Sequence, residues 1–122
     1  MERGETTAQA VLAVPVLLLF LLLGVQISMF FNTAQLAAIA AQDGAIAGSV
    51  HGGSETLAIA AAIKTTAEQR ASEAKTPDVR IDNGVIEVKV ILHVPAVVPF
   101  FTSSVSRSAS EPLERFVLEV DR

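Results

Sequence analysis

The feature that most limits what this chain can form is an uncharged apolar segment from Ala10 to Phe31. Its roughly 22 residues match the ~20 that a helix needs to cross a hydrocarbon core about 30 Å thick. Three interpretations compete: a signal peptide that is removed, a permanent membrane anchor, or a helix that the membrane holds until an assembly takes it up. A secretory signal has a shorter apolar region, of about 7–15 residues, with a cleavage site close behind it. Because the apolar character here continues to Ala47, the sequence favours a segment that is retained.

Charged residues are distributed unevenly along the 122-residue chain. Of its 9 Lys and Arg and 13 Asp and Glu residues, only Glu2, Arg3, Glu5 and Asp43 precede Val50. With Arg3 and the amino group in front of the span, the positive-inside rule places the N-terminus in the cytoplasm. We therefore expect a single-pass protein of the cytoplasmic membrane whose C-terminal domain lies outside.

Strong helix formers continue beyond the apolar segment. One helix from about Thr6 to Gly48 would be roughly 65 Å long at 1.5 Å per residue, about twice the thickness of the bilayer core. We expect a transmembrane part at 5–32 and a continuation outside the membrane at 33–50. The alternative to a packing role for this continuation is that its alanines only favour helicity and that Gly48 ends the helix. Small residues spaced for close approach to another helix are Ala37, Ala41, Gly44, Ala45 and Gly48.

The remaining residues, 51–122, are expected to form an exported α+β domain. Ser54 is a candidate N-cap for a second helix that reaches about Lys75. The apolar seam of this helix is narrow, so it buries little surface and needs a partner to stay folded. The seam consists of Ala60, Ile63, Ala67, Ala71 and Ala74.

Beyond Pro77 the apolar pattern changes to a period of two, and the pair Asn83 and Gly84 is the strongest short signal for a β-hairpin. A two-residue loop sets Arg80 against Glu87, and it also aligns apolar residues with apolar residues across the strands. The apolar face of the second strand would cover the second helix or the outer end of the first. It consists of Ile86, Val88, Val90, Leu92 and Val94.

Residues 102–110 are expected to return as a third, serine-rich strand after a turn punctuated by proline. The predicted fold class is therefore α+β. It comprises a long N-terminal transmembrane or pilin-like helix, a second helix, and a small antiparallel sheet formed by the hairpin and the third strand.

Composition and motifs argue against several classes of function. A net charge of −4 without a basic cluster, and the absence of Trp and Tyr, do not fit a nucleic-acid binder. Ser72 and Lys75 have the spacing of a serine acylase motif without its companion elements, and His51 and His93 lack a zinc-ligand pattern. We expect no enzyme activity, no metal, no cofactor and no small-molecule substrate.

The stretch from Arg3 to Ser49, RGETTAQAVLAVPVLLLFLLLGVQISMFFNTAQLAAIAAQDGAIAGS, resembles the N-terminus of TadE-like proteins. These are minor pseudopilins of tight-adherence (Tad/Flp) pili, and the resemblance is to their actinobacterial form. The downstream stretches VKVILHVPAVVPFF and EPLERF resemble the C-terminal parts of the same group. The resemblance therefore covers most of the chain.

The resemblance implies that a prepilin peptidase cuts after a glycine at the cytoplasmic face and that a glutamate five residues further on aligns subunits. Carried over by position, the glycine is Gly4, so residues 1–4 form a short leader and Glu5 becomes the first residue. The fifth residue after Gly4 is Gln9. This is a departure from the family pattern, because Gln9 has no carboxylate to pair with a neighbouring amino terminus.

The resemblance and the long helix together lead us to expect a pseudopilin-like structural component of a tight-adherence pilus or a related secretion apparatus. It would act through helix packing and not through catalysis. Its expected partners are the membrane, other pseudopilin or pilus-assembly subunits and a prepilin peptidase. The alternative is a single-span envelope protein whose exported domain binds another partner.

Overall fold

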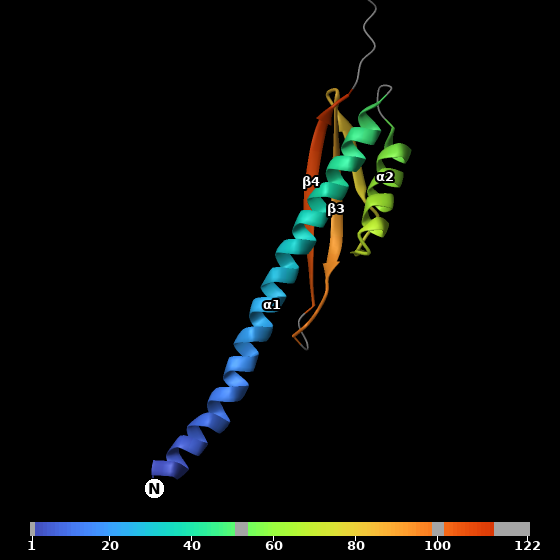
Figure 1. Ribbon diagram of the computed structural model, residues 1–122. Helices are drawn as coiled ribbons and strands as arrows, with labels where there is room; N and C mark the ends of the chain where they lie inside the picture. Colours follow the sequence, from blue (N-terminus) through green and yellow to red (C-terminus); the bar gives the residue numbers. More distant parts are fainter. Residues whose placement is uncertain (1, 51–53, 99–101, 114–122) are drawn as a thin grey trace, which may run out of the picture.

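The computed structural model of the protein describes residues 2–50, 54–98 and 102–113. These residues form a long helical rod with a small domain at one end (Figure 1). The elements follow one another as helix α1 at Glu2–Ser49, helix α2 at Glu55–Glu68, and the strands β1 at Ser72–Glu73, β2 at Asp78–Asp82, β3 at Val85–Val94 and β4 at Ser103–Pro112. The predicted α+β class, with its long first helix and its small antiparallel sheet, is confirmed.

Helix α1 runs through Pro15 as one uninterrupted helix. Its two halves have different surroundings. Every side chain from Gly4 to Val25 is exposed, whereas buried positions recur from Gln26 to Gly48. Figure 1 shows the same division, since the first half projects beyond the domain and the second half lies along the sheet. We call these parts the bare half and the docked half of α1.

The sheet is built around β3. Strand β4 pairs with β3 along its whole length, while β2 and then β1 pair with it on the other edge. The β2–β3 register sets Arg80 against Glu87 and Ile81 against Ile86, as the pairing arithmetic predicts. Asn83 and Gly84 both have positive φ, 52° and 76°, which is the backbone of the tight hairpin turns that match strand twist. The predicted hairpin is confirmed.

Within the described residues, helices cover one face of the sheet. Alternate residues of β3 from Ile86 to Val94 are buried, and Glu87 and Lys89 between them are exposed. The buried side chains pack chiefly on the docked half of α1, so the apolar face covers the outer end of the first helix. The common core consists of Ala37, Ala40, Ala41, Ala45, Ala58, Ala62, Ile86, Val88, Val90 and Leu92.

Helix α2 differs from its prediction in length. The Ser54 side chain accepts a hydrogen bond from the Leu57 amide, as expected for an N-cap, but the helix ends at Glu68 and not near Lys75. Arg70 turns the chain with a φ of 56°. The following residues then pair with β3 as strand β1, a strand that the sequence did not reveal because it is only two residues long.

The predicted apolar seam of α2 is also wrong. Ala60, Ile63 and Ala67 are exposed, and Ala71 and Ala74 lie beyond the end of the helix. The buried side is the one that faces α1, where Ala58 and Ala62 lie against Gly44 and the Thr65 hydroxyl binds Asp43. The buried residues of α2 are Ala58, Ala62, Thr65 and Thr66.

Candidate membrane and helix-packing surfaces

The docked half of α1 packs closely against α2 at two glycines. A Cβ atom added to Gly44 would lie 2.9 Å from the Ala58 carbonyl oxygen, and one added to Gly48 would lie 2.7 Å from the Ala58 Cβ and 3.0 Å from the Ser54 carbonyl oxygen. Real Cβ contacts are almost never that short. Glycine at these two positions therefore allows the backbones of α1 and α2 to meet.

All the small residues predicted to form a packing face are buried inside the chain's own domain. Ala37, Ala41 and Ala45 have no exposed surface, and Gly44 and Gly48 are buried as well. Their neighbours are α2 and the apolar face of β3. The face thus packs against elements of the same chain, and a helix from another subunit would meet it only if α2 moved away.

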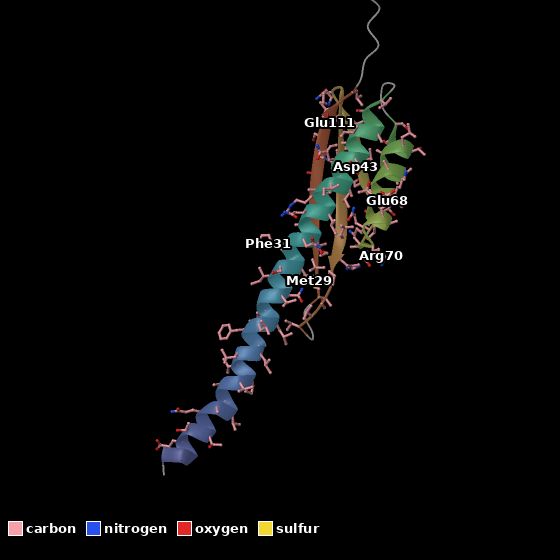
Figure 2. The ribbon with its side chains drawn as sticks, in the orientation of Figure 1. Met29, Phe31, Asp43, Glu68, Arg70 and Glu111 are labelled. Atoms are coloured by element: carbon pink, nitrogen blue, oxygen red, sulfur yellow. The ribbon has the colours of Figure 1, made fainter. Side chains whose placement is uncertain are left out.

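A polar contact joins the two helices beside this face. The Thr65 hydroxyl donates to the Asp43 carboxylate at 2.7 Å, and Figure 2 shows Asp43 on the docked half of α1. The Thr66 hydroxyl donates to the Ala62 carbonyl within α2, so both buried threonines of α2 are satisfied. Because Asp43 and Thr65 are far apart in sequence, no local spacing announces their contact.

Gln26 is a second polar residue whose role the sequence did not reveal. Its side chain is 4% exposed, and it binds the loop between β3 and β4. The Gln26 Nε2 donates to the Pro95 carbonyl oxygen at 3.0 Å, and its Oε1 accepts from the amides of Val97 at 2.7 Å and Val98 at 3.3 Å. One side chain therefore satisfies three backbone groups of a segment that is neither helix nor strand. The sequence signal for this role was the position of a polar glutamine in an otherwise apolar run.

The bare half of α1 has the dimensions and chemistry of a membrane span. It belongs to the one candidate spanning helix among the described residues, which covers Gly4–Ser49. Its large side chains are apolar and open to the surroundings, with Leu12, Leu17 and Phe20 at 65–70% exposure. A helix that is apolar all round and that the described residues leave uncovered suggests a single-pass membrane protein.

The residues proposed for processing lie at the free end of this rod. Gly4, Glu5 and Gln9 are exposed on the first turns of α1, and a Cβ added to Gly4 would have no atom within 4 Å. Figure 1 shows this end far from the sheet and α2. Another protein can therefore reach these residues, and the described part of the α+β domain does not contact them.

The other residues considered for chemistry are not brought together. Ser72 begins strand β1 while Lys75 lies beyond it, so the pair is not on one helix face. His93 is exposed on β3, and His51 lies outside the described residues. Within the part of the chain that the structure describes, no group of three His, Asp or Glu side chains could hold a metal ion.

An α+β domain carried on a single candidate membrane-spanning helix is the class of protein that these surfaces define. The family model of TadE-like proteins matches residues 4–45. The matched residues lie within α1 and cover less than half of the chain, so the resemblance to TadE-like proteins is confirmed for this helix. No curated protein and no solved structure matches the chain.

Proposed function

We propose that the protein is a pseudopilin-like structural component of a tight-adherence pilus or a related secretion apparatus. The observation that carries this proposal is the TadE-like match, which lies wholly within the single helix α1. The matched segment contains no catalytic constellation. What it offers is an apolar rod with a domain fixed to one end, which is the form a subunit needs in order to assemble by helix packing.

The proposed arrangement in the membrane follows from the distribution of charge. Residues 1–4 form a cytoplasmic leader, 5–32 cross the membrane, 33–50 continue outside it and 51–122 complete the exported domain. No charged residue lies between Glu5 and Asp43, and Asp43 contacts α2 of the domain. The positive-inside rule then favours a cytoplasmic N-terminus.

The bare half of α1 is the surface that we assign to partner subunits. The small-residue face of the docked half is already covered by α2 and β3, so it contributes to assembly indirectly, by fixing the domain to the helix. Contacts between subunits then fall on the apolar side chains of the bare half. The proposal also includes a likeness of the chain to the actinobacterial form of the family and a resemblance of its C-terminal part to that group. It further includes incorporation of the protein into a filament.

Deletion of the gene in the native host tests this function. We expect the strain to lose tight-adherence pili, or the adherence that depends on them, and to recover both when the full-length gene is returned. Electron microscopy of the cell surface and a surface-attachment assay provide the measurements. Normal pili and attachment in the deletion strain would favour the alternative, an envelope protein whose exported domain binds another partner.

Processing by a prepilin peptidase gives a separate prediction. We expect the mature protein to begin at Glu5, because a glycine offers a peptidase close access to the backbone and Gly4 is unobstructed. The change Gly4→Leu should block the cut, while Gln9→Glu should be tolerated. Intact mass measurement on protein from native membranes distinguishes the two forms. A wild-type chain that still carries Arg3 and Gly4 would contradict the prediction.

A further inference from the structure

The structure describes residues 95–98 of the connection between β3 and β4, and we call these four residues the β3–β4 loop. They leave the sheet at the end that faces the bare half of α1. Figure 1 shows the end of β3 and the coloured residues that follow it at the lower end of the domain, and the β2–β3 turn at the opposite end. Gln26 fixes the loop to α1 through its hydrogen bonds to Pro95, Val97 and Val98. The loop and this position of the helix therefore lie at the same level along the rod.

That level coincides with the expected outer limit of the hydrocarbon core. Glu5 is the last charged residue before the apolar helix. From Thr6 to Val25 the helix contains about 20 residues, which at 1.5 Å per residue span roughly 30 Å, the thickness of the core. If Glu5 remains at the cytoplasmic surface, Gln26 emerges at the opposite surface and brings the loop with it.

The chemistry of the loop suits that position. The sequence carries no charged residue from Val94 to Ser106. Pro95 and Ala96 are exposed, and Val97 and Val98 are half-buried. A water-exposed loop of a small domain is normally polar, so an uncharged apolar loop that projects toward a membrane span needs a different explanation.

The neighbouring part of α1 extends the same apolar surface. Ile27 is 57% exposed and Phe31 is 61% exposed, and Figure 2 labels Phe31 on this stretch of the helix. A shallow cavity of about 220 Å³ is lined by Leu23, Gln26, Ile27, Phe30 and Phe31. Exposed apolar side chains of α1 therefore continue from the bare half to the level at which Gln26 binds the loop.

We propose that the β3–β4 loop rests in the outer interface of the lipid bilayer and seats the domain on the membrane. Irregular backbone is tolerated at this depth only when its polar groups form hydrogen bonds with protein. Gln26 forms such bonds with the Pro95 carbonyl and with the amides of Val97 and Val98. The hydrocarbon core would then end near Gln26 and not near residue 32. This inference requires that α1 crosses the membrane with Glu5 at the cytoplasmic surface, and it does not require a pilus.

The absence of cysteine allows a direct test with single-cysteine variants of the full chain. Ala96→Cys reports on the loop, Leu17→Cys on the middle of the bare half, and Ser108→Cys on an exposed site of β4. Each variant is labelled with the environment-sensitive fluorophore NBD and placed at low density in vesicles of phosphatidylcholine and phosphatidylglycerol. Quenching is then compared for lipids with a nitroxide near the headgroup, lipids with a nitroxide deep in the acyl chain, and aqueous iodide.

We expect the Ala96 label to be quenched several-fold more strongly by the shallow lipid nitroxide than the Ser108 label, and to be protected from iodide. The Leu17 label should respond most to the deep nitroxide. Equal exposure of the Ala96 and Ser108 labels to iodide, with the Leu17 label still in lipid, would overturn the loop inference and leave the anchor intact. Protection of the Ala96 label from both iodide and lipid would also overturn it, because a protein surface would then cover the loop. A Leu17 label outside lipid would remove the membrane span itself, and the proposed function with it.

Discussion

Replacing Gly48 by leucine is expected to destabilise the α+β domain by about 3 kcal/mol, at the upper end of the cost of overpacking. The first added carbon alone would lie 2.5 Å from the Ile86 Cδ1, 2.7 Å from the Ala58 Cβ and 3.0 Å from the Ser54 carbonyl oxygen. Ile86 can change its rotamer, but the Ser54 backbone and the Ala58 Cβ move only with α2. The free energy of unfolding is measured by denaturant titration of the full chain in detergent. The protection of α2 from protease is measured as a second readout.

The matched control is Gly24→Leu, the same change on the same helix. A Cβ added to Gly24 would have no atom within 4 Å, so the substitution adds only helix propensity. We expect the domain of this variant to unfold like that of the wild type. If Gly48→Leu and Gly24→Leu leave the domain equally stable, then α2 does not pack on the glycines of the docked half.

Replacing Gln26 by leucine is expected to release the β3–β4 loop from α1. The Pro95 carbonyl and the amides of Val97 and Val98 lose their side-chain partner, and each buried polar group left unpaired costs about 1–3 kcal/mol. Water can replace part of the loss where the loop opens. We therefore expect the amides of Val97 and Val98 to exchange with solvent on the order of a hundred-fold faster, which corresponds to about 3 kcal/mol. Hydrogen exchange followed by NMR or mass spectrometry measures this effect.

Gln35→Leu serves as the control for this variant. Gln35 is exposed on the docked half of the same helix, so its replacement removes an equivalent amide group without touching the loop. Protection of Val97 and Val98 should be unchanged in Gln35→Leu. Unchanged protection in Gln26→Leu would mean that the loop is held by its other contacts.

The parts of the fold that depend on local sequence were predictable. The hairpin register followed from residues that face each other across a two-residue turn, and Ser54 was recognisable as a cap because an N-cap contacts residues only a few positions ahead. The length of α1 followed from its composition. Each of these features is decided within one or two neighbouring elements.

The features that were missed depend on contacts between distant residues. The buried side of α2 is selected by Gly44 and Gly48 of α1, and β1 exists only because β3 extends far enough to pair with it. Periodicity does not distinguish one alanine-containing side of α2 from another, and the side that is buried is decided by the contacts of Ala58 and Ala62 with Gly44. The spacing of small residues in α1 likewise predicted close packing without revealing that α2 is what packs there.

The role of Gln26 could not be deduced from spacing either, since its hydrogen-bond partners lie about 70 positions away in the sequence. The sequence shows a single amide side chain between two apolar stretches, but the tertiary structure is needed to identify its hydrogen-bond partners. Membrane orientation and the processing of Gly4 stay predictions, because they depend on other molecules.

The alignment of α1 with the long strands has a mechanical consequence. The docked half of the helix runs beside β3 and β4 (Figure 1), and it is held by contacts along much of its length, from Gln26 to Gly48. A force that draws the helix along its own axis therefore loads these contacts in shear, all at the same time, and does not peel them apart one after another. Displacing α1 by one helical turn, about 5.4 Å, would therefore move the whole domain with it as a rigid body.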